Sequence, residues 1–267
     1  MSRLAGLFAE LAEKNRKALI PFVTAGDPNP DFTVPLMHAM VGAGVDIIEL
    51  GVPFSDPMAD GPVIQRASER ALAHHQSLRT TLAIAKEFRK TNGHTPIVIM
   101  GYLNPVEIMG YEKFADAVQA AGVDGVLTVD LPPEEAEECA ALLKARSVDP
   151  IFLLAPNSTP ERVKIMDAIG SGYIYYVSLK GVTGAGHLNS AEVETKLAEI
   201  RANTKLPLAV GFGVKDAQTA KIIGNLGDGV VVGSALIKEI EANLHNPAQA
   251  KTAIIELLTS MRQAMDN

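Results

Sequence analysis

The sequence of 267 residues contains a single cysteine, Cys139, so no disulfide can form within the chain. One cysteine also leaves no CxxC pair and no cysteine framework of the kind that small secreted or zinc-binding domains use. Cys139 lies in a stretch with helical periodicity, where we expect it to pack as a small apolar residue. The sequence therefore argues against a disulfide scaffold, a structural zinc site and secretion.

Long hydrophobic runs and excess positive charge are also missing. No run approaches the roughly 20 apolar residues of a membrane helix, and the first twenty residues carry charges throughout instead of an apolar signal segment. The 24 Lys and Arg against 31 Asp and Glu give a formal net charge of −7. Nucleic-acid backbones select basic faces, so an acidic chain is a poor match for them. We expect a cytoplasmic protein with no membrane or nucleic-acid partner, although a small phosphorylated ligand needs only a local positive field.

Metal and dinucleotide motifs are absent as well. The six histidines are scattered, and the adjacent His74 and His75 are badly spaced for joint metal ligation from one helix face. The first apolar run ends in Thr24–Pro28, TAGDP, which lacks the GxGxxG fingerprint of a dinucleotide-binding turn. We therefore expect neither a metal site nor a bound nucleotide cofactor.

What the chain does contain is a regular alternation of short apolar runs and helical periodicity. The strand candidates are Ala18–Thr24, Val45–Leu50, Pro96–Met100, Gly125–Val129, Ile151–Leu154, Tyr173–Val177, Pro207–Val210 and Gly229–Val232. Most of them are unalternated apolar runs, which are typical of parallel strands buried on both faces. The helical stretches include Arg3–Lys14, Phe32–Val41, Thr80–Lys90, Tyr111–Ala121, Glu134–Arg146, Glu161–Ala168, Ala191–Asn203, Asp216–Ile223 and Pro247–Met265.

Eight such units are the number that closes a (β/α)8 barrel, which typically takes about 250 residues as one domain. The alternative, a doubly wound open sheet, usually has about five to seven strands and a glycine-rich turn after the first. We therefore predict an α/β fold: a single-domain TIM barrel over residues 1–267, with an extra N-terminal helix that plugs its bottom. The long connections after the second strand, Gly51–Pro62, and after the sixth, Ser178–Ser190, are candidate lids, because they emerge at the C-terminal face of the strands.

Two glycine-containing turns predict a phosphate site. Gly211-Phe212-Gly213 follows the seventh strand, and Gly233-Ser234 follows the eighth and opens a helix. Glycines let backbone amides approach an anion, and a helix start adds partial positive charge. Many barrels bind phosphate in these two loops. The alternative is a pair of tight turns with Ser234 as an ordinary N-cap.

Two carboxylates stand out at the predicted C-terminal face. Glu49 ends the second strand among apolar residues, where burial raises the pKa of a carboxyl and suits it to both donate and accept protons. The alternative is a structural carboxylate bound to loop amides. Asp56 and Asp60 follow in turn-like contexts that alone indicate only Asx turns. Thr183 and Gly184 lie in the second long loop, which either closes over a ligand or is a mobile surface loop; periodicity does not separate the two.

These motifs resemble the tryptophan synthase alpha family. The segment Glu49–Gln65, ELGVPFSDPMADGPVIQ, is long enough to be specific, whereas the glycine pairs are not. Further matching blocks follow in the family's order along nearly the whole chain: Pro21–Pro28, Met100–Pro105, Gly125–Leu127 with Asp130–Pro132, Tyr175–Ser178, Gly181–Gly184, Gly211–Gly213 and Val232–Ser234.

The resemblance implies a lyase that splits indole-3-glycerol phosphate into indole and glyceraldehyde 3-phosphate. It assigns the acid-base role to Glu49 and the carboxylate facing the indole nitrogen to Asp60. It implies a phosphate site and an apolar indole pocket, with Tyr175 positioning the acid-base and Thr183 docking the lid near Asp60. The implied phosphate residues are Gly184, Gly213, Gly233 and Ser234, and the implied pocket residues are Phe22, Ile64, Tyr102, Leu127 and Phe212.

The resemblance also implies that this chain holds no cofactor, since pyridoxal phosphate belongs to a beta subunit that receives the indole in an alpha2-beta2 tetramer. Three alternatives stay open at this point. The chain is another phosphate-binding barrel enzyme such as a sugar-phosphate isomerase or aldolase, a stand-alone indole-releasing lyase, or a non-catalytic subunit that only activates a beta chain. Retention of both Glu49 and Asp60 speaks against the last of these.

Overall fold

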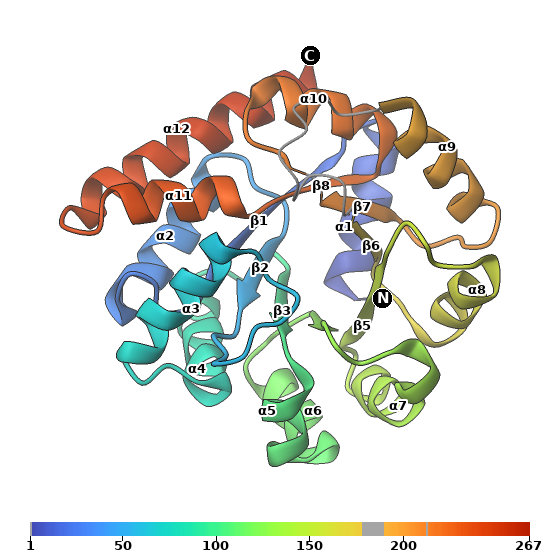
Figure 1. Ribbon diagram of the computed structural model, residues 1–267, viewed down its shortest axis with the longest axis horizontal. Coiled ribbons are helices and arrows are strands. Elements are labelled where there is room, and N and C mark those ends of the chain that lie inside the picture. Colours follow the sequence, from blue (N-terminus) through green and yellow to red (C-terminus); the bar gives the residue numbers. More distant parts are fainter. Residues whose placement is uncertain (1, 178–189, 212) are drawn as a thin grey trace.

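Eight parallel strands close into one barrel, in the order β1-β2-β3-β4-β5-β6-β7-β8 with β8 paired back to β1 (Figure 1). The computed structural model describes residues 2–177, 190–211 and 213–267. The strands are β1 Ala18–Thr24, β2 Ile48–Gly51, β3 Ile97–Gly101, β4 Gly125–Thr128, β5 Asp149–Leu154, β6 Ile174–Val177, β7 Leu208–Gly211 and β8 Gly229–Val232. The predicted barrel is confirmed, and all eight strand candidates lie within three residues of the observed bounds.

Helices surround this barrel, as Figure 1 shows. They are α1 Arg3–Glu13, α2 Pro30–Gly42, α3 Pro62–Ala73, α4 Leu78–Arg89, α5 Leu103–Met109, α6 Tyr111–Ala120, η1 Pro133–Glu135, α7 Glu137–Ala145, α8 Pro160–Ile169, α9 Ser190–Arg201, α10 Ala217–Leu226, α11 Ser234–Ala242 and α12 Pro247–Asp266. The predicted helices are confirmed, whereas α3 and the short α5 were not predicted. Within the described ranges, none of the helices is long and apolar enough to cross a membrane.

The N-terminal helix α1 forms the floor of the barrel, as the sequence predicts. Its buried side chains Leu4, Phe8 and Leu11 belong to the inner core, together with inward-facing residues from the strands. The Phe8 ring lies 5.8 Å, centroid to centroid, from that of Tyr173. A larger core fills the space between strands and outer helices. Among the described residues, the interior of the barrel is therefore packed with side chains below its C-terminal mouth.

Three aspartates close the bottom edge of the sheet. Asp46, Asp124 and Asp228 lie just before β2, β4 and β8, and each accepts the backbone N–H of a residue at the start of the preceding strand, at 2.8, 2.8 and 2.9 Å. Each also pairs with an arginine, which comes from α12, α4 and α9 respectively. The strand starts are thereby tied to the outer helices. The predicted second strand, Val45–Leu50, begins three residues too early because Asp46 serves this edge.

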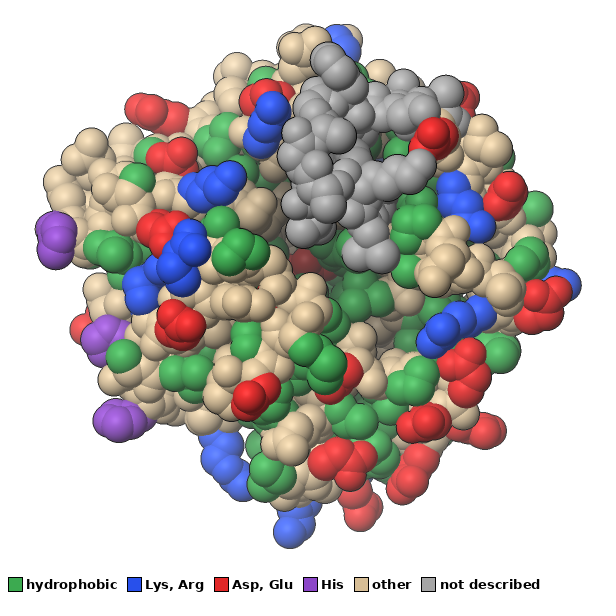
Figure 2. Space-filling view, in the orientation of Figure 1, with side chains coloured by type: hydrophobic (Ala, Val, Ile, Leu, Met, Phe, Trp, Pro, Cys, Tyr) green, Lys and Arg blue, Asp and Glu red, His purple; other side chains and the backbone are tan. Residues whose placement is uncertain are grey.

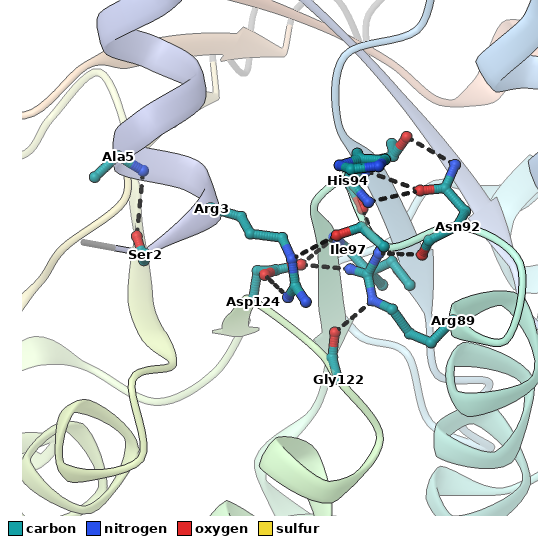
Figure 3. A network of polar contacts seen from close by, with 11 residues as sticks. Ser2, Arg3, Ala5, Arg89, Asn92, His94, Ile97, Gly122 and Asp124 are labelled. Atoms are coloured by element: carbon teal, nitrogen blue, oxygen red, sulfur yellow. Dashed lines mark hydrogen bonds and ion pairs between the residues drawn. The ribbon is translucent and has the colours of Figure 1, made fainter.

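Asp124 is the most buried of the three aspartates. Figure 3 shows Arg3 of α1 and Arg89 of α4 converging on its carboxylate, at 2.7 and 2.6 Å. The side chain of Asp124 is 4% exposed and that of Arg89 is 10% exposed. Arg89 also donates to three backbone carbonyls, of Gly122, Asn92 and Thr95. The guanidinium is thus fixed at a site where water cannot replace the carboxylate.

We expect Asp124→Ala to lower the free energy of unfolding by about 3–5 kcal/mol, because it leaves the buried Arg89 charge unpaired. Urea denaturation of the purified chain measures this loss. The matched control is Asp116→Ala on α6, whose carboxylate pairs with Arg146 but is 62% exposed; it should cost less than about 1 kcal/mol. Equal losses in the two variants would show that burial of the Asp124 network contributes nothing.

Candidate functional site

A cavity of about 440 Å³ opens at the C-terminal ends of the strands. Figure 2 looks onto this face, which is hollowed near its centre beside the grey atoms. The described residues lining the cavity are Phe22, Asp60, Gly61, Pro62, Val63, Ile64, Met100, Tyr175, Val177, Gly211, Gly213, Val214, Val231, Gly233, Ser234 and Lys238. They come from β1, β3, β6, β7 and β8 and from the loops and helices that follow strands β2, β7 and β8.

One side of the cavity is apolar. Phe22 of β1, Met100 of β3 and Val231 of β8 point inward from the strands, and Ile64 of α3 faces them from the rim. Gly51 lies against the Phe22 ring, since a Cβ there would stand 2.5 Å from its Cζ atom. This side can hold a flat aromatic group by burying its faces against hydrocarbon.

The other side of the cavity is formed by the backbone of the loops that follow β7 and β8. Gly213 has a φ of +49°, and a Cβ placed on it would meet no atom within 4 Å, so this turn faces open space. Gly233 directly precedes α11, whose first residue is Ser234. Amides at a helix start carry partial positive charge and bind anions. The end of the cavity formed by the β7 and β8 loops therefore offers the donors that a phosphate needs.

Glu49 lies just below the cavity. Its side chain is fully buried, and its Cα is paired in register with that of Phe22. The Tyr173 hydroxyl donates a hydrogen bond to Oε1 at 2.6 Å, while Oε2 has no hydrogen-bond partner among the described residues. Burial raises the pKa of Glu49 to about 8, and the hydrogen bond from Tyr173 only partly opposes this. The carboxyl is thus protonated at neutral pH and close to its titration point.

The residue bound to Glu49 is not the one that the sequence analysis named for this role. Tyr175 was expected to position the acid-base, whereas the described hydrogen bond comes from Tyr173, two residues earlier. Tyr175 lines the cavity, and after burial its pKa is raised further by the charges of Glu49 and Asp60, so it lies near both carboxyls. Residues two apart on a strand point to the same face. That alternation was the signal that could have identified Tyr173.

Asp60 stands at the rim of the cavity on the loop between β2 and α3. Its Oδ2 accepts a hydrogen bond from the Tyr102 hydroxyl at 2.9 Å, and the same hydroxyl accepts the Ala59 N–H at 3.1 Å. The Tyr102 ring stacks on Phe54, with centroids 5.2 Å apart. Burial raises the pKa of Asp60 above its ordinary value, and the bond from Tyr102 partly offsets this. The loop is thereby held with one carboxylate facing the cavity.

The structure brings most of the predicted site residues together. The cavity is lined by Phe22, Asp60, Ile64, Tyr175, Gly213, Gly233 and Ser234. Three others are placed differently: Glu49 and Leu127 lie inside the barrel and do not line the cavity, and Tyr102 stands behind Asp60. Thr183, Gly184 and Phe212 lie outside the described residues, as does nearly all of the predicted lid Ser178–Ser190.

Comparisons with known proteins agree with this geometry. The family described as "Tryptophan synthase alpha chain" matches residues 8–266. The chain is 64% identical to the tryptophan synthase alpha chain of Methylococcus capsulatus and 60% identical to that of Thioalkalivibrio sulfidiphilus, and each match covers 100% of both proteins. Among solved structures, it is similar to tryptophan synthase subunit alpha from Legionella pneumophila, with a TM-score of 0.94, 44% identity and coverage of 100% and 99%. It is also similar to a chain of tryptophan synthase from M. tuberculosis in an aminoacrylate-bound form, with a TM-score of 0.87, 34% identity and coverage of 99% and 100%.

Proposed function

The chain belongs to the tryptophan synthase alpha chain family, and from this premise we propose that Glu49 and Asp60 carry out its reaction. The reaction is the lyase cleavage of indole-3-glycerol phosphate into indole and glyceraldehyde 3-phosphate. The alpha chain carries no cofactor of its own, so its side chains must move the protons. The observation that carries the proposal is the fully buried carboxyl of Glu49, which is paired in register with Phe22 of a cavity that has an apolar wall and an anion-binding end.

Glu49 supplies the proton that starts the cleavage. Protonation of indole C3 makes the bond to the glycerol chain breakable, and the electrons of that bond then return to the ring. The resulting Glu49 carboxylate takes the proton of the neighbouring chain hydroxyl as the aldehyde forms, which restores the starting acid. A pKa of about 8 suits both transfers near neutral pH. Because Tyr173 holds Oε1 and Oε2 has no hydrogen-bond partner in the described part of the chain, we assign the transfers to Oε2.

Asp60 stabilises the intermediate between these two transfers. Protonation at C3 leaves positive charge on the indole nitrogen, and a carboxylate held in place beforehand lowers the energy of that charge without having to reorganise. Tyr102 and the stacked Phe54 fix the Asp60 loop at the rim. In this arrangement the indole ring lies against Phe22 and Ile64, with its nitrogen toward Asp60 and the phosphate at Gly213, Gly233 and Ser234.

Indole release tests the proposed function. The purified chain is given indole-3-glycerol phosphate, with and without a beta subunit, and free indole is measured. The proposal requires turnover that rises when beta is added. Strong turnover that beta does not change would favour the stand-alone lyase. No indole from folded chain under either condition would overturn the proposal in favour of another phosphate-binding barrel enzyme.

We propose that a beta subunit, in an alpha2-beta2 tetramer, covers the rim formed by the 52–61 loop and α5. Met58 in this loop is 77% exposed and Ile108 of α5 is 81% exposed, the two most exposed large hydrophobic residues described. Tyr102, directly before α5, bonds to both Ala59 and Asp60, so the two segments adjoin. Large exposed apolar side chains on adjoining segments support a protein interface at this rim. The rim also borders the cavity, which gives the released indole a short path to the partner.

We expect Ile108→Asp to weaken binding of the beta subunit at least about tenfold, as loss of a buried apolar anchor does at protein interfaces. Titration calorimetry against purified beta measures the dissociation constant. Ile165→Asp on α8, where the isoleucine is 37% exposed, is the matched control and should bind like the wild type. Equal binding by the two variants would place the interface elsewhere.

Two further expectations belong to the same proposal. We propose that residues 1–267 form a single domain; the closure of one barrel by strands drawn from Ala18 to Val232 and the packing of α12 against α2, α10 and α11 support this. A cytoplasmic location, expected from the sequence, remains a prediction.

A further inference from the structure

The proposed substrate brings a phosphate dianion into a chain with a net charge of −7. Backbone amides and a helix start supply partial charges, equivalent to about half an elementary charge at a helix N-terminus. Among the described residues that line the cavity, Asp60 adds negative charge and Lys238 is the one cation. A full counter-charge would add to the partial charges of the glycine turns, and among the described lining residues Lys238 is the side chain that can provide it.

The geometry of α11 carries the Lys238 ammonium toward the phosphate end. Lys238 is four residues after Ser234, so the two lie on one face of the helix. Helical side chains lean toward the N-terminus of their helix, so a long one covers the turn before its own Cα. Lys238 is exposed at its helix position and lines the cavity with Gly233 and Ser234.

Glu241, the carboxylate with which Lys238 could form an ion pair on α11, is already paired with arginines. Glu241 lies three residues further along α11, within reach of Lys238. Two arginines of α3 pair with Glu241. Arg66 donates hydrogen bonds to both carboxylate oxygens, with Nη2 to Oε2 at 2.8 Å. Arg70 Nη1 lies 3.5 Å from Oε1. The hydrogen bond from Arg66 lowers the pKa of Glu241 and keeps it ionised. The Lys238 charge also helps to lower the pKa of Glu241, but less than the two arginines do. No ion pair joins Lys238 to the described residues, and its side chain lines the cavity.

We propose that Lys238 is a specificity-determining residue: its ammonium neutralises the substrate phosphate and makes the enzyme prefer a phosphorylated glycerol chain. The inference rests on the proposed function and deepens it, because it names the side chain that pairs with the phosphate of the substrate. It assigns Lys238 a part in binding and none in the proton transfers of Glu49.

Lys238→Met keeps the length of the side chain and removes its charge. We expect the KM for indole-3-glycerol phosphate to rise about tenfold, a typical worth for a charge-assisted contact, with kcat changed less than twofold. Lys238→Arg should restore most of the affinity. Added potassium chloride should raise the KM of the wild type more than that of Lys238→Met, because salt screens the contact that the variant lacks.

The control is Lys86→Met, which removes another exposed lysine, on α4, that does not line the cavity. It should leave KM, kcat and the salt dependence unchanged. A KM in Lys238→Met within twofold of the wild type would overturn the inference, and so would an equal rise in the Lys86→Met control.

Binding of inorganic phosphate separates this inference from the proposed function. Phosphorus NMR or calorimetry measures the dissociation constant without any turnover. Weaker phosphate binding by Lys238→Met than by the wild type supports the inference even if the chain releases no indole, in which case only the proposed function fails. Equal phosphate binding contradicts it whatever the activity.

Discussion

We expect Glu49→Gln to lower the kcat of indole release by roughly 10³-fold, which is within the range that a general acid-base contributes. Glutamine has the shape of glutamic acid and still accepts the hydrogen bond from Tyr173, so the barrel interior is expected to stay packed. It cannot deliver a proton to indole C3 or take one from the chain hydroxyl. Steady-state kinetics with indole-3-glycerol phosphate measure the loss, and an unchanged circular dichroism spectrum shows that folding is not its cause.

The same substitution changes how stability depends on pH. Burial raises the pKa of Glu49 from 4.5 to about 8, so between these values the folded chain holds a proton that the unfolded chain has lost. Stability contributed by the protonated carboxyl is complete below pH 4.5 and is lost as the pH rises through 8. The variant has no such group. Relative to the wild type, Glu49→Gln should therefore gain on the order of a few kcal/mol between pH 5 and 8, as about 1.4 kcal/mol accompanies each tenfold change in proton affinity.

Urea denaturation at several pH values tests this second effect. The matched control is Glu87→Gln on α4, where the glutamate side chain is 56% exposed. Its stability should follow the wild type at every pH. A Glu49→Gln curve that also runs parallel to the wild type would mean that Glu49 is ionised in the folded chain.

Asp60→Asn is the second large expected effect, with kcat falling about 10²–10³-fold and KM nearly unchanged, as for other groups that stabilise charge in a transition state. Asparagine can still accept the Tyr102 hydrogen bond, so the rim keeps its shape while the charge facing the indole nitrogen disappears. Because burial raises the pKa of Asp60 above 3.8, the acid limb of the rate profile should lie above that pH, where Asp60 takes up its proton.

Tyr102→Phe separates the charge of Asp60 from its placement. This variant keeps the carboxylate and the ring that stacks on Phe54, and it removes only the hydroxyl that holds Oδ2. Its kcat should fall about tenfold, in line with the loss of one hydrogen bond to a charged group. An Asp60→Asn variant no worse than Tyr102→Phe would contradict an electrostatic role for the carboxylate.

The fold was accessible from the sequence because parallel barrel strands are buried on both faces and read as continuous apolar runs. β1 and β8 were predicted to the residue for this reason. Errors arose where polar side chains serve the sheet edge, as at Asp46, or where a helix is short, as at α5. α3 was missed although Pro62 occupies its first position, a common helix start. The apolar runs thus reveal the strands better than periodicity reveals short helices.

The candidate site was accessible only in part. Glu49 was recognised because a carboxyl among apolar strand residues is costly to bury unless it has a function or a partner. The glycine turns were recognised by their position after the last two strands. Tyr173 was missed because a tyrosine at a strand start looks like core until its partner is known. Leu127 was assigned to the pocket; it is fully buried in the inner core, paired in register with the cavity residue Met100, and its place in the pocket stays a prediction. The depth of a side chain in the barrel depends on the tilt and stagger of all eight strands, which no single segment encodes.

Lys238 was missed for a different physical reason. A lysine on an amphipathic helix is most simply read as a solvated side chain, and its nearby Glu241 looks like its partner. Only the folded chain brings Arg66 and Arg70 of α3 against Glu241 and leaves Lys238 at the cavity. The charge balance at this end of the cavity thus depends on α3 and α11 together.

The most direct test of the account is the pKa of Glu49 itself. Carbon-13 NMR of the chain labelled at glutamate carboxyl carbons, recorded from pH 4 to 9, follows each side chain, and comparison with Glu49→Gln identifies the resonance of Glu49. The account predicts one carboxyl that titrates near pH 8 and is missing from the variant. If every glutamate titrates below about pH 5, near the ordinary value of about 4.3, Glu49 is ionised in the folded chain and its role as the proton donor is contradicted.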